Sequence, residues 1–296
     1  MPNETQKSSQ TNHHRVIVIT NGNFFARLIL ERLLIEWRPQ IAGVVLIEGD
    51  YSGRTGMNAL WHIARKTTPP YLIFKLVQII AFRFAQKLYP NVWFEVAPMA
   101  RDLGIPTYRA PRVNSSEVYD WIRQKSPTLG VSVSCPQRIR KRLLSLPSHG
   151  FINIHSSLLP RYAGLAPYFW VLAENCVETG VTVHYMTEQF DEGNILAQCV
   201  LEIPERVSAF ELFRQLAMLG QDVLIEAVEK TLRGERGTPQ QLEQRSYYSH
   251  PSFRAYIALR QNGFALLRWG ELRRAVQGTI QRQSEIKQVR IDALAR

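Results

Sequence analysis

The stretch "RVIVITNGNFFARLILERLLIEWRPQIAGVVLIEG" covers residues 15–49 and decides the expected fold. Its first run, 15–20, is β-branched and is followed by Asn-Gly-Asn, which is typical of a buried strand that ends in a turn. Residues 24–37 place leucines at helical spacing, and 41–49 form a second apolar run. A strand, a helix and a strand in so short a stretch predict a βαβ unit, and hence a parallel sheet with right-handed crossovers.

The alternation continues for most of the chain. We expect a helix end and a strand at 99–111, helices at 116–125, 138–146, 168–176 and 209–234, and strands at 128–135, 150–155, 179–186 and 195–203. The predicted fold class is therefore α/β, with a Rossmann-like open, mostly parallel sheet and a short helical C-terminal appendage. The first turn contains one glycine and lacks G-x-G-x-x-G, which argues against binding of NAD or FAD.

The amino-acid composition limits which classes of protein the chain can belong to. Of 296 residues, 45% are hydrophobic and 21% are charged, as in a soluble globular protein. Three scattered cysteines without a C-x-x-C motif argue against a disulfide framework and a zinc site, and they fit a reducing, cytoplasmic compartment. We expect a disordered tail at 1–14, one main domain at 15–235 and a basic helical appendage at 236–296, which opens with a linker-like stretch at 236–253.

An apolar insert interrupts the alternation at about 54–90. Its segment 69–90 is too short and too charged to span a bilayer, because Lys75, Gln78 and Arg83 interrupt it. As a helix it places Lys75, Gln78 and Gln86 roughly on one face and apolar residues on much of the rest. Packing in the core or in an oligomer explains this pattern. A lid over an apolar acceptor and an interfacial helix remain open alternatives.

The net charge of +11 is concentrated near the C-terminus, where residues 245–296 hold ten Lys or Arg and three Asp or Glu. Such a tail suggests an anionic partner, such as RNA, a nucleotide or a membrane surface. A solvated helical surface explains it equally well.

Three polar residues are candidates for chemistry. Asn153 and His155 are two apart in the strand "GFINIH", so their side chains share one face, and Asp191 lies in the loop "EQFDEGNI" between two later strands. An amide and an imidazole can donate to the oxyanion of a tetrahedral intermediate, and a carboxylate near the imidazole can orient it and accept a proton. A core histidine, a turn-capping Asn and an ordinary loop carboxylate explain the spacing as well. Ser134, Ser156 and Ser157 suggest a nucleophile, but no G-x-S-x-G elbow is present.

Residues 151–198 resemble the core of the folate-dependent formyltransferases, a family that includes the methionyl-tRNA, phosphoribosylglycinamide and nucleotide amino-sugar enzymes. The resemblance lies in Asn153, His155, "SLLPRYAG" (157–164), "ETGVTVHYM" (178–186) and Asp191-x-Gly193 followed by Ile195. It implies that Asn153, His155 and Asp191 form a catalytic trio, that 10-formyltetrahydrofolate is the donor and that no metal is needed. It places the pterin against segments 98–110 and 129–137, with folate contacts from Ser134, Pro136, Ser157, Leu158, Pro160, Gly164 and Gly193.

The resemblance leaves the amine acceptor to be decided. Ala163 stands where the tRNA enzymes tend to have a second Arg, and Ser156 stands where Pro is usual. The tail also reads as helices, whereas the tRNA enzymes carry a β domain. These departures favour an amino sugar nucleotide or a related small amine. Methionyl-tRNA, hydrolysis of the formyl-folate and a non-catalytic RNA-binding role remain alternatives, and a homo-oligomer is possible.

Overall fold

The computed structural model describes residues 14–294, with the backbone alone described at 289–294. The expected disordered tail falls almost wholly on residues 1–13, outside the described residues.

A seven-stranded sheet forms the centre of the molecule. In spatial order its strands are β3 (Thr107–Ala110), β2 (Ile41–Ile47), β1 (Val16–Thr20), β4 (Leu129–Val133), β5 (Phe151–His155), β7 (Glu178–Tyr185) and β8 (Ile195–Glu202). The first five pair in parallel, and β7 is antiparallel to both β5 and β8. The predicted α/β class with a mostly parallel sheet is confirmed. The chain turns from one half of the sheet to the other between β1 and β4, the kind of position where open α/β sheets bind ligands.

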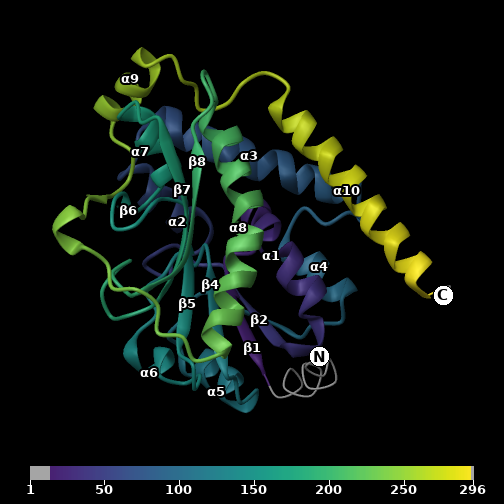
Figure 1. The fold of residues 1–296 in the computed structure, drawn as a ribbon. Helices are drawn as coiled ribbons and strands as arrows, with labels where there is room; N and C mark the ends of the chain where they lie inside the picture. Colours follow the sequence, from purple (N-terminus) through teal and green to yellow (C-terminus); the bar gives the residue numbers. More distant parts are fainter. Residues whose placement is uncertain (1–13, 295–296) are drawn as a thin grey trace, which may run out of the picture.

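Helices cover both faces of this sheet (Figure 1). One face carries α1 (Phe24–Glu36), α4 (Val96–Asp102) and α8 (Ala209–Leu232), and the other carries α5 (Ser116–Gln124) and α6 (Lys141–Leu144). Asn23 caps α1 through its side chain, which accepts from the Ala26 N–H, and Ser208 caps α8 in the same way at Glu211.

Helix α6 is shorter than the predicted helix at 138–146. The Asn114 side chain donates to the Arg138 carbonyl and accepts from the Arg140 N–H. These tertiary hydrogen bonds keep the chain extended until residue 140, so the helix begins only at Lys141. Hydrogen bonds from a side chain in a distant loop therefore override the helical pattern of the sequence at this point.

The insert at 54–90 folds as two helices, α2 (Gly56–Ala64) and α3 (Pro69–Leu88). Two of the polar residues of α3 that we expected to share one face, Lys75 and Gln78, lie toward the rest of the molecule. Gln78 is buried, and Lys75 lies 3.4 Å from the Tyr168 hydroxyl, where burial lowers the pKa of its ammonium to about 8. Much of the apolar face, including Ile80 and Phe84, is exposed instead. Helix α3 thus buries one face, which includes Phe74 and Phe82, and leaves other apolar side chains exposed.

The C-terminal segment is helical, as predicted, but it begins with a strand. Residues 236–253, expected to be linker-like, contain β9 (Tyr247–Tyr248), which pairs in parallel with β6 (Ala163–Gly164). The two helices that follow are α9 (Phe253–Gln261), against α7 (Pro167–Ala173), and α10 (Glu271–Leu294), which contacts α3. In Figure 1, α10 is the long yellow helix that ends at the C-terminus. The supposed linker is therefore part of the main fold.

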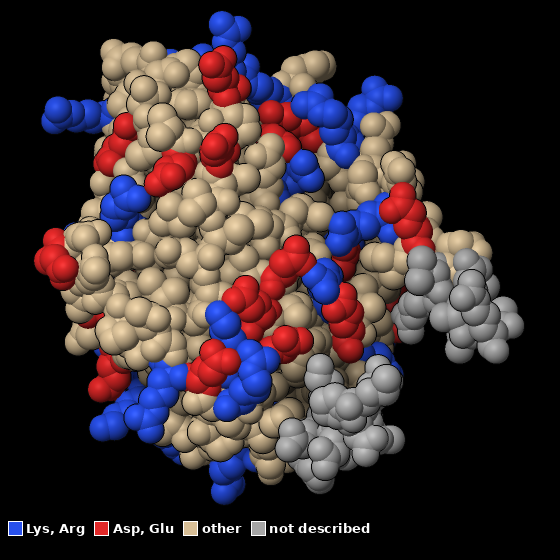
Figure 2. Space-filling model, viewed as in Figure 1, with Lys and Arg blue, Asp and Glu red and all other residues tan. Residues whose placement is uncertain are grey.

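Lys and Arg are interspersed with Asp and Glu on the face of the molecule drawn in Figure 2. Within residues 14–294, no helix is both long enough and apolar enough to cross a membrane.

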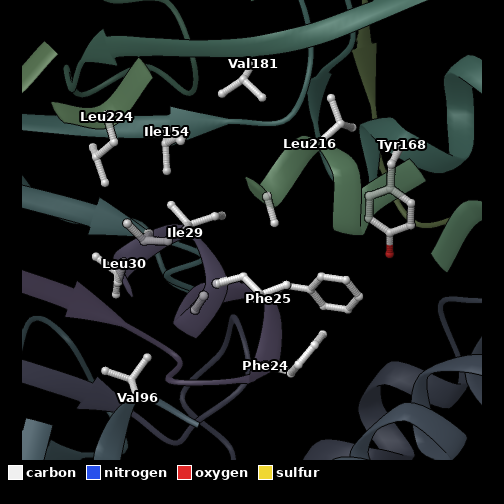
Figure 3. Close-up of a cluster of buried hydrophobic side chains, with 14 of the residues drawn as sticks. Phe24, Phe25, Ile29, Leu30, Val96, Ile154, Tyr168, Val181, Leu216 and Leu224 are labelled. Carbon is white, nitrogen blue, oxygen red and sulfur yellow. The ribbon is translucent and has the colours of Figure 1, made fainter. Parts of the chain in front are cut away.

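Strand β1 separates two hydrophobic cores. Val16 and Val18 face the cluster under α1 and α8, whereas Ile17 and Ile19 face the cluster under α5. Figure 3 shows the first cluster, where side chains of α1 meet those of α8, β5 and β7. Because alternate residues of a strand point to opposite faces, a run that is apolar at every position must be covered on both sides. This burial fixes β1 at the centre of the sheet.

A buried charge network ties α10 to α1. Glu31 forms ion pairs with both Arg27 and Arg282, and the side chains of Arg27 and Glu31 are 0% and 1% exposed. Arg282 also donates to Gln221 of α8 at 3.0 Å. One carboxylate thus pairs with two guanidinium groups where three helices meet, so its removal leaves the buried Arg27 cation without a counter-charge.

We expect Glu31→Gln to lower the free energy of unfolding by about 3–5 kcal/mol, the usual cost of removing one partner of a buried pair. Urea denaturation followed by circular dichroism measures this. The control is Glu36→Gln on the same helix, whose side chain is 45% exposed and pairs with Arg32. It should cost less than about 1 kcal/mol. Equal costs for the two variants would contradict the assigned role of Glu31.

Candidate functional site

Asn153 and His155 occupy the carboxyl-terminal half of β5, on one face of the strand. The His155 side chain is 9% exposed and that of Asn153 is partly buried. Strand β4 pairs Ser132 with Asn153 on one side, and β7 pairs with β5 on the other. Both side chains are therefore held in the interior of the sheet rather than at a free edge.

The antiparallel register of β7 brings a second histidine to the site. His184 stands opposite Asn153, and the Asn153 Nδ2 lies 3.3 Å from the His184 Nε2. The His184 Nδ1 lies 2.8 Å from the Tyr185 carbonyl oxygen, so the ring proton is assigned to Nδ1. Burial lowers the pKa of His184 and favours the neutral ring. Its Nε2 then accepts one N–H of Asn153, and the second N–H of that amide stays available.

The backbone carbonyl of Tyr162 orients the imidazole of His155. The His155 Nε2 donates to this oxygen at 2.8 Å. The Nδ1 faces the Asp191 Oδ2 at 3.9 Å, a distance compatible with an ion pair but too long for a hydrogen bond. We expected Asp191 itself to hold the ring, but in this structure a loop carbonyl does so. Protonation at Nδ1 would direct a new N–H toward the carboxylate.

Asp191 lies in the loop between β7 and β8 with a φ of 56°. Its Oδ2 accepts the Gly164 N–H at 2.9 Å, and its Oδ1 lies 3.7 Å from the His184 Nε2. Burial acts to raise the pKa of this carboxyl, but His155, His184, the Gly164 N–H and Arg245 outweigh it and hold the pKa below its usual value. Asp191 is therefore a carboxylate at neutral pH.

The segment before β9 holds both loops of the site. The Gln240 side chain donates to the carbonyls of Asp191 and Gly193 at 3.0 and 2.7 Å, and Arg245 donates to the Phe190 carbonyl at 3.1 Å. Ser246 accepts the Tyr162 N–H through its side chain at 2.9 Å. The Tyr162 carbonyl, which orients His155, and the loop that carries Asp191 are thus secured by one stretch of chain.

The residues predicted to bind folate lie after β4 and in the two loops that follow β5 and β7. Ser134 and Pro136 are partly buried directly after β4. Leu158 and Pro160 line a hollow of about 320 Å³ together with Gln198, and none of the three catalytic candidates lines it.

Three of the predicted folate contacts already have structural roles. The Ser157 side chain is fully buried, and its hydroxyl donates to the Arg161 carbonyl at 2.9 Å. Gly164 supplies the N–H bound by Asp191. A Cβ on Gly193 would lie 1.9 Å from the Tyr185 carbonyl oxygen, so this position requires glycine.

The arrangement supplies an amide donor, an imidazole and a carboxylate within one small region. Such a set can stabilise an oxyanion and move a proton without a nucleophilic side chain. Within the described residues, no group of three or more His, Cys, Asp or Glu side chains could hold a metal ion.

Sequence reasoning missed His184 and the Tyr162 carbonyl. His184 comes two residues after Thr182 in a β-strand pattern, so the sequence indicated that the side chains of these two residues share one face of the strand. Its position opposite Asn153 depended on the strand register, which the pattern did not provide.

Comparison with known proteins identifies the family. The sequence profile described as "Formyl transferase" matches residues 14–228, which is more than half of the chain. The chain belongs to the formyl transferase family. The resemblance noted in the sequence is thereby confirmed at the level of the family and the fold.

Curated relatives of this formyl transferase family member include methionyl-tRNA formyltransferases. The protein from Halothermothrix orenii is 34% identical over 155 residues, which cover 52% of this chain and 49% of that protein. The protein from Geobacter metallireducens is 37% identical over 145 residues, covering 49% and 46%. The chain thus spans about half the length of the curated relatives it matches.

Solved structures with the same fold include two further kinds of formyltransferase. An N-formyltransferase from Helicobacter canadensis, in complex with folinic acid and dTDP-3-aminofucose, has a TM-score of 0.54 at 17% identity, covering 80% of this chain and 71% of its own. Glycinamide ribonucleotide transformylase 1 from Symbiobacterium toebii has a TM-score of 0.53 at 18% identity, covering 77% and 93%. At such identities, the likeness establishes the fold alone.

The lowered pKa of Asp191 predicts how this carboxylate contributes to stability. A carboxyl whose folded pKa lies below its unfolded value of about 3.9 stabilises the protein above that value, and the contribution is lost as the pH falls through the folded pKa. The difference in unfolding free energy between the wild type and Asp191→Asn should be present at about pH 5 and shrink below about pH 4. Urea unfolding across this range measures it. A difference that persists unchanged at the acid end would contradict the assignment.

Proposed function

We propose that this chain transfers a formyl group from 10-formyltetrahydrofolate to a primary amine. The observation that carries the proposal is the placement of Asn153 and His155 on one face of β5, with Asp191 3.9 Å from the His155 Nδ1. Membership of the formyl transferase family supports it. An oxyanion site of this kind suits acyl transfer between two nitrogens.

In the proposed reaction, the amine nitrogen attacks the formyl carbon and forms a C–N bond. The formyl oxygen becomes an oxyanion, which accepts from the free N–H of Asn153 and is stabilised by the positive charge of the protonated His155 ring. The negative charge of Asp191 stabilises this imidazolium. The attacking nitrogen loses a proton, relayed by Asp191 through water to the folate nitrogen, and the bond from carbon to that nitrogen then breaks. Atoms and charge balance without an external acid.

We assign the folate to the carboxyl ends of β4 and β5. Ser134 and Pro136 are partly buried there, directly beyond the strand that pairs with β5. This is also next to the switch between β1 and β4, where open α/β sheets bind ligands. Contacts by Ser157 and Gly193 are better explained by their roles in the two loops.

For the acceptor, we favour an amino sugar nucleotide or a related small amine. Ala163 is fully buried and its N–H is bound by the Ser246 carbonyl at 3.0 Å, so this position supplies no cation to an acceptor. Methionyl-tRNA is the second candidate, because the curated relatives are methionyl-tRNA formyltransferases. The regions that match these relatives cover about half of this chain, so an experiment has to decide between the two acceptors.

We expect Asn153→Ala and His155→Ala each to lower kcat by roughly 100-fold or more, the usual scale for removal of an oxyanion donor. Asp191→Asn should be similarly damaging because the imidazolium loses its counter-charge. The matched control is His149→Ala, because His149 precedes the amino end of the same strand and should leave kcat unchanged. Folate release measured by absorbance gives the rates. Wild-type turnover in both Asn153→Ala and His155→Ala would refute the proposed site.

Incubation with 10-formyltetrahydrofolate and a panel of amines tests the acceptor, with the product identified by mass. We expect formylation of a small amine, and binding of tRNA no tighter than the nonspecific range of roughly 10⁻⁴ to 10⁻⁶ M. Efficient formylation of initiator methionyl-tRNA, together with a steep loss of affinity with salt, would replace the small amine by tRNA. Folate release that needs no amine would instead indicate hydrolysis.

A further inference from the structure

The α2–α3 insert combines cationic and apolar residues without any acid. Between Asp50 and Glu95 the chain has no Asp or Glu, and its Lys and Arg residues are Arg54, Arg65, Lys66, Lys75, Arg83 and Lys87. This differs from the face drawn in Figure 2, where both signs are interspersed. Within the described part of the chain, no carboxylate forms an ion pair with Arg54, Arg65, Arg83 or Lys87. The charge of this surface is therefore left without an internal partner.

Helix α3 exposes an apolar stripe. Ile73, Ile80 and Phe84 are 60%, 67% and 66% exposed, and Val77 and Leu88 lie on the same line at steps of three and four residues. Such steps place side chains on one helix face. The opposite face is already packed, because the buried residues of α3 are Tyr71, Phe74, Gln78, Phe82 and Ala85. The stripe is thus an outer surface that the described residues leave uncovered.

Helix α2 adds to the exposed apolar surface. Met57 and Trp61 are one turn apart and are 66% and 63% exposed, and α2 contacts α3. Contiguous apolar surface of this kind marks an interaction site in a soluble protein. Tryptophan in particular is enriched where an apolar medium meets water.

A cationic hollow lies beside Trp61. It has a volume of about 510 Å³ and is lined by Arg54, Arg65, Asn58 and His62, among others. The nearby Asp50 carboxylate is not among the residues that line the hollow: its side chain is 1% exposed and is bound by His62 at 2.8 Å and by the N–H groups of Ser52 and Arg54. The hollow therefore suits a phosphate group.

We propose that the α2–α3 insert docks the protein on the surface of an anionic lipid bilayer. The apolar stripe of α3, together with Met57 and Trp61, enters the boundary between head groups and acyl chains, as an interfacial helix does. The flanking cations then face lipid phosphates, with Arg54 and Arg65 around one of them. The protein lies on the bilayer and does not span it.

The charge pattern favours a bilayer over a second copy of the chain. A twofold interface places one patch against itself, so cations would face cations with no Asp or Glu of the insert to separate them. An anionic surface satisfies the same cations and also accepts the apolar stripe.

Co-sedimentation of the full chain with vesicles tests this proposal. We expect binding to vesicles of equal parts phosphatidylcholine and phosphatidylglycerol, no binding to phosphatidylcholine alone, and release by high salt. Arg65→Gln and Lys66→Gln should each weaken partitioning roughly fivefold.

The double variant Ile80→Glu with Phe84→Glu should bind at least tenfold more weakly, because it places charge in the apolar stripe. The control is Val177→Glu, at a position that is 82% exposed outside the insert. It should bind like the wild type. Circular dichroism of every variant confirms that it is folded.

Three outcomes would overturn the proposal. The first is a wild type that does not associate with anionic vesicles under any salt condition tested. The second is a double Glu variant that binds as well as the wild type, which would reduce the effect to general charge attraction. The third is a dimer, seen by light scattering, that the double Glu variant converts to a monomer without any vesicle binding, in which case a second copy covers the stripe.

Discussion

The antiparallel pairing of β7 with β5 is the constraint on which the candidate site depends. It places His184 opposite Asn153 and Thr182 opposite His155. It also returns the chain so that the loop after β7 brings Asp191 to the end of β5. A shift of one residue would turn His184 to the other face of the sheet, because side chains alternate along a strand. Every distance in the site follows from this register.

The electrostatics of the site follow from the same pairing. The Asp191 carboxylate lies 3.9 Å from the His155 imidazole and 3.7 Å from that of His184, in a region that is largely closed to water. Burial favours neutral His184, and the surrounding donors favour charged Asp191. Both pKa values are lowered, which leaves His184 neutral and Asp191 negatively charged at neutral pH. The bond to neutral His184 orients the Asn153 amide, and the His155 ring lies beside the Asp191 carboxylate.

The C-terminal segment is part of this machinery rather than an appendage to it. Gln240, Arg245 and Ser246 bind backbone groups of both site loops, and a buried carboxylate on α1 holds Arg282 of α10. A chain that ended at α8 would lack the contacts that keep the Tyr162 carbonyl against His155. The basic residues of this region therefore have at least two structural uses before any anionic partner is considered.

The sequence by itself determined the class of fold, most of the element positions, and the grouping of Asn153 with His155. Apolar periodicity specifies strands and helices locally, and residues two apart on a strand must share a face. The family followed from a long ordered motif. Only the tertiary structure decided that α6 begins late, that β9 replaces a linker, and that α3 turns Gln78 inward and Phe84 outward. It also decided that Tyr162 rather than Asp191 binds His155, and that His184 joins the site. Each of these depends on partners distant in the chain, and a local pattern cannot determine which partner a polar group or an apolar face will meet.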